Sequence, residues 1–350
     1  MLYPLKFQPV YQDYLWGGRE LAKLGKHLPP GIVAESWEIS VHPEGVSVVA
    51  GGEYDGMPFP QLIERLGTDL LGRNPGAQTG FPLLVKLIDA SDRLSVQVHP
   101  DDVYARTYEN GACGKTEMWY VLAAKPGAQL VYGLAPGITK EMFARAVDNG
   151  RVEECLQTIE VFPGDAFYIP AGLVHAIGAG IVIAEIQQSS NLTYRVFDYG
   201  RVDKNGNQRP LHLEKALAVM DFSGMSRRGK CPGLTVISGT QSKTYHVANR
   251  YFSVETSLIR GVISEDTGGK SFIVLYGIQG EGEIVSSGGR TPIVTGETVL
   301  LPAGLGAYQI QGKLRLLRAY VPDLAADVIG PLRNAGFSET EIMERVVDMG

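Results

Sequence analysis

An internal repeat constrains the fold of this chain more than any other feature of its sequence. Residues 163–173 (PGDAFYIPAGL) are echoed by residues 295–305 (TGETVLLPAGL), so a glycine turn, a short apolar run and a Pro-Ala-Gly turn occur twice. Upstream, residues 115–117 (KTE) have a weaker echo in residues 270–272 (KSF). A short-strand unit that occurs twice predicts a mainly β protein built from two related small β barrels.

The two copies differ in length and in side-chain chemistry. Apolar residues recur at helical spacing over about 136–157, which predicts a helical insertion in the first copy. The repeat aligns Phe272 with Glu117 and Ala307 with His175, so the second copy lacks these polar residues. We therefore expect the second barrel to be metal-free and structural.

The sequence predicts four consecutive parts. Residues 1–205 form an N-terminal catalytic barrel that includes the helical insertion, and residues 206–231 form a connecting helical segment. Residues 232–322 form the second barrel. Residues 323–350 form a short helical tail, because Ser338 and Glu341 have the spacing of a capping box.

Four polar side chains in the first copy have the pattern of a metal site. Strict alternation of apolar and polar residues over 94–99 places Gln97 and His99 on one face of a strand. Glu117 alternates in the same way with Lys115 and Trp119, and His175 follows the Pro-Ala-Gly turn. This set of nitrogen and oxygen ligands suits a divalent transition metal with room for a substrate, with the neutral Gln97 amide as the weakest donor.

Bulk properties exclude several classes of protein. The net charge of −6 argues against nucleic acid or an anionic membrane as the main partner, so an anionic ligand needs local positive charge. Three cysteines without paired spacing make a disulfide framework improbable. No apolar run has the form of a signal peptide or of a membrane helix. We expect a cytoplasmic protein that is a monomer or a small homo-oligomer.

The order of its motifs resembles one enzyme family. The Gly-Asp/Glu … Pro-Ala-Gly … His pattern is similar to the cupin superfamily, whose domains are jelly-roll-like β barrels. More closely, the chain resembles the short bacterial type I mannose-6-phosphate isomerases. The matching strings are residues 15–18, 34–40, 84–86, 94–102, 114–120, 170–176 and 193–199.

The resemblance implies an activity, a cofactor and a set of site residues. It implies one zinc ion per chain, held by Gln97, His99, Glu117 and His175, and interconversion of mannose 6-phosphate and fructose 6-phosphate. It makes Arg195 catalytic and Lys115 a candidate for proton transfer, and it puts Ser95 and Lys86 near the phosphate. Trp16 and Glu35 either line the pocket or only pack. Many relatives have an aspartate four positions before the arginine, where this chain has Asn191.

The chemistry of these residues agrees with such a reaction. Aldose–ketose isomerisation builds negative charge on oxygen in an enediol(ate), which a divalent cation and the permanently charged Arg195 can stabilise. A lysine near a metal can act as the base, although a bound water or another pocket group is an alternative to Lys115. Lys86 provides local positive charge for a phosphate. The competing interpretations are another cupin sugar-phosphate isomerase, a cupin dioxygenase and a non-enzymatic sugar-binding cupin.

Overall fold

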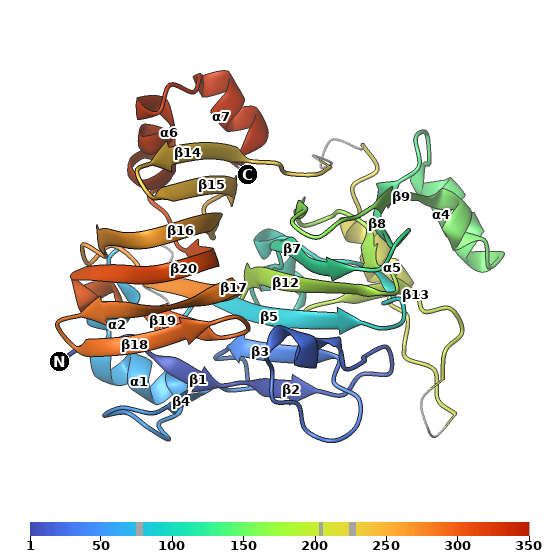
Figure 1. Ribbon diagram of the computed structural model, residues 1–350. Coiled ribbons are helices and arrows are strands. Elements are labelled where there is room, and N and C mark those ends of the chain that lie inside the picture. The colour runs from blue at the N-terminus through green and yellow to red at the C-terminus, as the bar shows by residue number, and fades with distance from the viewer. Residues whose placement is uncertain (75–79, 203–205, 224–228, 350) are drawn as a thin grey trace.

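The computed structural model describes residues 1–74, 80–202, 206–223 and 229–349. Over these residues the chain is mainly β, as the repeat predicts, and two strand-rich units lie side by side (Figure 1). Four stretches of the predicted parts lie outside the described residues: 75–79 and 203–205 of the N-terminal part, 224–228 of the connecting segment and 350 of the tail. Within the described residues, no helix is long and apolar enough to cross a membrane.

The first unit consists mainly of two antiparallel sheets that enclose an apolar core and a polar cavity between them. The six-stranded sheet has the order β10-β7-β12-β5-β3-β2, and the five-stranded sheet has the order β13-β6-β11-β8-β9. The strands of the first sheet are β2 (Val10–Gln12), β3 (Glu35–Ile39), β5 (Leu83–Ala90), β7 (Glu117–Ala124), β10 (Ala166–Ile169) and β12 (Ile181–Gln188). Those of the second are β6 (Val96–Val98), β8 (Gln129–Leu134), β9 (Leu156–Glu160), β11 (His175–Ile177) and β13 (Tyr194–Phe197).

The second unit is one sheet whose longest strands bend sharply. Its order is β14-β15-β16-β20-β17-β18, with β19 also paired to β17. Gly261 in β16 is the partner of Gly312 in β20, and both have positive φ angles (117° and 142°) that a residue with a side chain rarely adopts. The strands are β14 (Leu234–Ser238), β15 (Gln241–Ala248), β16 (Ser253–Asp266), β17 (Ile273–Ser286), β18 (Gly289–Val294), β19 (Thr298–Leu301) and β20 (Ala307–Tyr320).

The predicted barrels need one correction. Among the described residues, the six-, five- and seven-stranded sheets are not closed by hydrogen bonds, because in each of them the strands at the two ends are not paired with each other. The first unit instead is a cupin-like sandwich, in which side chains from two sheets pack face to face. The alternation pattern of the sequence is the same in a sandwich and in a barrel, so it could not distinguish them.

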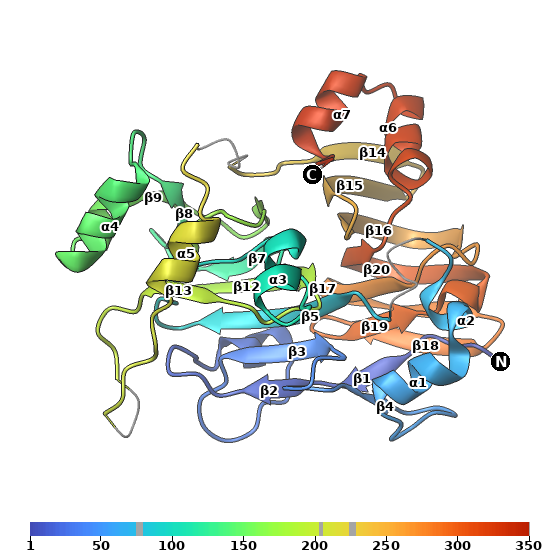
Figure 2. The same ribbon diagram turned by 180° about the vertical axis from the view of Figure 1, so that it is seen from behind.

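Helices occur where the sequence predicts them and in a few further places. The insertion contains α4 (Lys140–Asp148), capped by Thr139, and it projects beyond β9 in both views (Figures 1 and 2). In the tail, Ser338 and Glu341 form the predicted capping box of α7 (Glu339–Arg345). The remaining helical segments are η1 (Glu20–Leu24), α1 (Phe59–Leu66), α2 (Thr68–Leu71), α3 (Asp102–Tyr108), η3 (Val152–Cys155), α5 (Leu213–Val219), η4 (Ala303–Leu305), η5 (Leu324–Ile329) and α6 (Gly330–Asn334).

Strand register corrects the alignment of the repeat by one residue. In the first unit Ile169 pairs with Glu117, and in the second unit the equivalent Leu301 pairs with Ile273. Ile273, and not Phe272, therefore occupies the position of Glu117. The error arose because the upstream echo is short and contains only one identical residue. The position is still apolar, as predicted.

A shared apolar core joins the two units. Phe272 packs against Phe81 of the first unit, with ring centroids 4.7 Å apart, and both belong to the cluster that contains Met118 and Leu317. The N-terminal strand β1 (Lys6–Gln8), paired with β4 (Val48–Ala50), also lies against β19 of the second unit. The hydrophobic effect thus favours a fixed arrangement of the two units.

Phe272→Ala tests the contribution of this shared core. Phe272 has no solvent exposure, so truncation should leave a cavity and lower the free energy of unfolding by about 3–5 kcal/mol. The measurement is urea denaturation followed by tryptophan fluorescence. The control, Val262→Ala, removes an exposed side chain and should change the free energy by less than about 0.5 kcal/mol. Equal effects of the two substitutions would contradict a structural role for this core.

Candidate active site

Register in the five-stranded sheet puts three predicted site residues in one row. His175 of β11 and Arg195 of β13 are both paired with Gln97 of β6, which lies between them. Residues that are directly opposite in neighbouring strands project to the same face of a sheet. The row therefore brings together residues that are far apart in the sequence.

A second row lies on the facing six-stranded sheet. Lys86 of β5 is paired with Trp37 of β3 and with Glu185 of β12, and Glu185 is paired with Trp119 of β7. Glu117 begins β7, two residues before Trp119, and so projects to the same side. One polar cavity of about 240 Å³ is lined from this sheet by Lys86, Trp119 and Glu185 and from the first row by Gln97 and Arg195.

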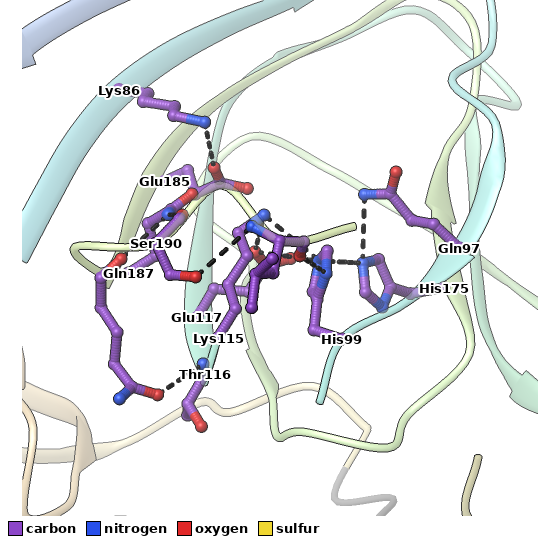
Figure 3. A network of polar contacts seen from close by, with 12 residues as sticks. Lys86, Gln97, His99, Lys115, Thr116, Glu117, His175, Glu185, Gln187 and Ser190 are labelled. Atoms are coloured by element: carbon purple, nitrogen blue, oxygen red, sulfur yellow. Dashed lines mark hydrogen bonds and ion pairs between the residues drawn. The ribbon is translucent and has the colours of Figure 1, made fainter. Parts of the chain in front are cut away.

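Three of the four predicted metal ligands converge within hydrogen-bonding range (Figure 3). The Nε2 atoms of His99 and His175 are 3.1 Å apart, and they lie 3.5 and 3.4 Å from the two carboxylate oxygens of Glu117. Candidate donor atoms of all three lie within 4.8 Å of one another, and the side chains are buried. The Gln97 amide is adjacent, with Nε2 3.4 Å from His175 Nε2.

The surroundings of both imidazoles favour metal binding through Nε2. His99 Nδ1 lies 2.8 Å from the carbonyl of Leu192, and His175 Nδ1 lies 2.8 Å from the carbonyl of Leu173. If each Nδ1–H donates to its carbonyl, each Nε2 keeps a free lone pair beside the Glu117 carboxylate. Burial lowers the pKa of His175 to about 4 and that of His99 well below its ordinary value, so both rings are neutral at neutral pH.

The donor set fits a divalent cation. Two unprotonated Nε2 atoms at 3.1 Å cannot satisfy each other, and Glu117 Oε1 is buried without a hydrogen bond. Burial and the nearby Glu185 carboxylate raise the pKa of Glu117 to about 7, which shows how unfavourable an uncompensated charge is there. A cation held by His99, Glu117 and His175 would satisfy all three, with the Gln97 amide close enough to contribute an oxygen after rotation.

Two buried lysines balance part of the negative charge. Lys115 Nζ lies 2.8 Å from Glu117 Oε2 and 3.2 Å from His99 Nε2. Lys86 Nζ lies 3.5 Å from Glu35 and 3.6 Å from Glu185. Burial lowers the pKa of Lys86, but the two carboxylates outweigh this effect and raise it above its ordinary value. Both lysines line the cavity, and each ammonium group lies close to at least one buried carboxylate.

The other predicted residues also line this cavity. Arg195 Nε donates to Ser95 Oγ (3.3 Å), and its Nη1 donates to the Pro210 carbonyl (2.9 Å). The sequence left open whether Trp16 and Glu35 line the pocket or only pack. Both side chains are buried, and both also line the cavity. Asn191, which departs from the family pattern, donates from Nδ2 to Glu44 Oε2 (2.6 Å).

Sequence reasoning missed three residues of the site. Glu185, which lines the cavity, accepts a hydrogen bond from Trp119 Nε1 (2.9 Å). Gln188 Oε1 accepts from the Thr116 backbone (2.9 Å) and so fixes the segment between Lys115 and Glu117. Arg209 adds a guanidinium that is hydrogen-bonded to Asp198. Glu185 could have been found in the sequence, because it is a charged residue within the apolar run 181–186. Arg209 could not, because it follows a segment with no strand or helix pattern.

Comparisons with known proteins agree with the geometry. The family described as phosphomannose isomerase type I, catalytic domain, matches residues 4–120, and the mannose-6-phosphate isomerase cupin domain matches residues 241–321. The sequence is 38% identical over 309 residues to mannose-6-phosphate isomerase ManA of Bacillus subtilis, covering 88% of this chain and 96% of that protein. It is 36% identical over 321 residues to mannose-6-phosphate isomerase of Streptococcus mutans, covering 91% and 99%.

Solved structures give the same result. The crystal structure of mannose 6-phosphate isomerase from Bacillus subtilis superimposes with a TM-score of 0.83 at 33% identity, covering 90% of this chain and 99% of that one. A mutant phosphomannose isomerase of Salmonella typhimurium has a TM-score of 0.72 at 17% identity, over 91% and 99% of the two chains, which supports the fold alone.

Metal binding should weaken as the pH falls. A proton competes with the metal for Glu117, whose pKa is about 7, while His175 stays neutral down to about pH 4. Zinc affinity, measured by competition with a chromophoric chelator, should therefore fall steadily from about pH 8 to about pH 5. His175→Ala should bind zinc far more weakly at every pH, and the exposed-residue control His27→Ala should match the native protein. A pH-independent affinity in the native protein would contradict the role of Glu117.

Proposed function

The chain belongs to the type I phosphomannose isomerase family, and from this premise we propose that it interconverts mannose 6-phosphate and fructose 6-phosphate with a bound divalent metal, through an enediol(ate). One observation carries the proposal: the metal-competent triad of His99, Glu117 and His175 is in contact with Lys115 and Gln97, which line a polar cavity together with Arg195. The family membership also favours an isomerase over the dioxygenase and the non-enzymatic interpretations. We propose zinc as the metal, because two imidazoles and a carboxylate are its common ligands in catalytic sites.

The charge balance of the cavity supports an anionic substrate. Glu35, Glu117 and Glu185 contribute three carboxylates when ionised, whereas Lys86 and Lys115 contribute two ammonium groups. The net charge of these five side chains is −1, and a divalent cation would change it to +1. The guanidinium of Arg195 adds a further positive charge. A sugar phosphate is therefore attracted locally, although the whole chain carries a net charge of −6.

The residues of the cavity match the demands of proton transfer next to a carbonyl. When bound, the metal supplies a positive charge that stabilises negative oxygen. Arg195 presents a second fixed positive charge, because hydrogen bonds to Ser95 and Pro210 hold its guanidinium in place. Lys115 is our candidate for moving the proton between the two carbons, since its ion pair with Glu117 fixes Nζ at the cavity wall.

We propose that the phosphate is bound at the part of the cavity that contains Lys86, Ser95 and Arg195. Lys86 is almost fully buried, and its charge is shared with Glu35 and Glu185, so it can attract the phosphate while the carboxylates hold it in position. Ser95 Oγ adds a hydroxyl group at the cavity wall. Arg209 adds a further cation, and it is the second candidate for this role.

Arg195→Ala tests the stabilisation of negative charge in the transition state. If Arg195 acts mainly there, kcat should fall by roughly 10²–10³, the range found when a preorganised donor is lost. Zinc content and the unfolding transition should remain those of the native protein. The control is Arg260→Ala, an exposed arginine of β16, which should leave kcat unchanged. A rise in KM alone would make Arg195 a binding residue.

Lys86→Ala tests recognition of the phosphate. Loss of a charge-assisted hydrogen bond should lower kcat/KM for mannose 6-phosphate by roughly ten- to a hundredfold. The slow turnover of unphosphorylated mannose should change little, because that sugar has no phosphate. The control, Lys6→Ala, removes a lysine that is paired with Glu297 and does not line the cavity. Equal losses on both sugars would instead assign Lys86 to the chemistry, or to neutralising Glu35 and Glu185.

A further inference from the structure

The second unit contains a cavity of its own, which none of the roles above uses. It has a volume of about 380 Å³ and is lined by β15, β16, β20 and the start of the helical tail. Ile273, which occupies the position of Glu117 in the repeat, also lines it. The second-unit cavity is therefore related by the repeat to the candidate metal triad, and its size is within the ~300–1,000 Å³ common for ligand pockets.

Buried charged groups converge in this cavity because the long strands bend. Glu255 and Glu265 lie ten positions apart in β16, on either side of Gly261, yet both interact with Arg318. Arg318 Nη1 donates to Glu265 Oε2 (2.6 Å), and the Tyr308 hydroxyl donates to the same oxygen (2.6 Å). Arg318 is 4% exposed and Glu255 is 1% exposed. Burying such a cluster is costly unless its hydrogen bonds are made.

Several of these hydrogen bonds are not made within the protein. Neither Arg318 Nε nor Glu255 Oε2 has a hydrogen-bond partner, and the two atoms are 3.8 Å apart. Lys243 Nζ lies 3.6 Å from Glu255 Oε2 and 3.5 Å from Glu265 Oε1. These separations are too long for good direct hydrogen bonds. Donor and acceptor side chains thus lie next to one another in the cavity lining, an arrangement that suits hydroxyl groups because each one both donates and accepts.

The charge of the cluster selects an uncharged ligand. Lys243 and Arg318 balance Glu255 and Glu265, and at the edge of the cavity Lys270 is paired with Asp327 (2.8 Å), which leaves the Asp266 carboxylate as one further negative charge of the lining. A phosphate or carboxylate placed there would face two carboxylates, and a cation would face Arg318 and Lys243. The cavity wall is not wholly polar, because the side chains of Ile273 and several tyrosines contribute to it.

From this arrangement we propose that the second-unit cavity is a non-catalytic binding site for an uncharged polyhydroxyl compound of monosaccharide size. Neighbouring donors and acceptors bind its hydroxyl groups, and the tyrosine and isoleucine side chains contact its carbon skeleton. Lys243 remains partly exposed, with 22% of its side chain accessible, so the site can be reached from solvent. This site is separate from the isomerase site, and the proposal does not depend on the reaction proposed above.

Binding is tested on the full chain with mannose, fructose and sorbitol, each used singly as a probe. Isothermal titration is carried out on Glu117→Ala, whose active-site metal binding is impaired, and on the same protein with Lys243→Met added. At least one probe should bind to Glu117→Ala, and Lys243→Met should weaken that binding by about tenfold or more, because a charged donor is lost. The matched control is Lys313→Met, which removes an exposed lysine of β20 and should leave the affinity unchanged.

A second variant and an activity measurement make the result specific. Ile273→Trp should fill the cavity and abolish binding of the probe; thermal unfolding of the unliganded variants shows that they are folded. In an otherwise native chain, Lys243→Met should retain the native rate with mannose 6-phosphate. No binding of any probe to Glu117→Ala would show that the cavity holds only water and would overturn the proposal. Binding that survives both Lys243→Met and Ile273→Trp would also overturn it, since the probe would then be bound elsewhere.

Discussion

Burial of ionised groups between two sheets is the constraint on which the active site depends. Glu35, Lys86, Lys115, Glu117 and Glu185 are all nearly inaccessible to water, so each needs a compensating charge or hydrogen bond. The lysines supply two positive charges against three carboxylates, and the raised pKa of Glu117 reflects the imbalance. The site is thus built to be completed by a cation. The protein gives up stability there in return for a cavity in which charge–charge interactions are strong.

Strand register converts distant sequence positions into this site. Gln97 lies between His175 and Arg195 because β6 pairs with both β11 and β13, and Lys86 faces them from the other sheet beside Glu185. A slip of one residue in any of these pairings would turn the side chains of that strand to the opposite face. The apolar residues that alternate with the ligands, such as Val96 and Val98, have no solvent exposure and oppose such a slip. The same packing that stabilises the sandwich therefore positions the side chains of the candidate site.

Local patterns were sufficient to predict much of the fold and most of the site. Alternation placed Gln97 and His99 on one face, the repeat predicted two related units, and helical spacing located α4. Alternation within one strand does not show which strands are neighbours. The sequence therefore could not predict that the sheets are open, that Ile273 is equivalent to Glu117, or that Glu185 lies beside Lys86. Lys86 illustrates the same limit. The sequence predicts a cation near the substrate, but its two carboxylate partners become evident only when β3, β5 and β12 are side by side.

The two units differ in how their buried charges are compensated. In the first, carboxylates exceed ammonium groups, and the imidazole nitrogens face one another without a proton to share. In the second unit, Ile273 occupies the position of Glu117. There the negative charges of Glu255 and Glu265 are neutralised by Arg318 and Lys243. This second cluster is electrically balanced by its own side chains. The unit also packs against its neighbour through the shared core around Phe272. Arg318 Nε and Glu255 Oε2 remain without a hydrogen-bond partner. In the proposed site these polar groups favour a ligand with hydroxyl groups over an ion.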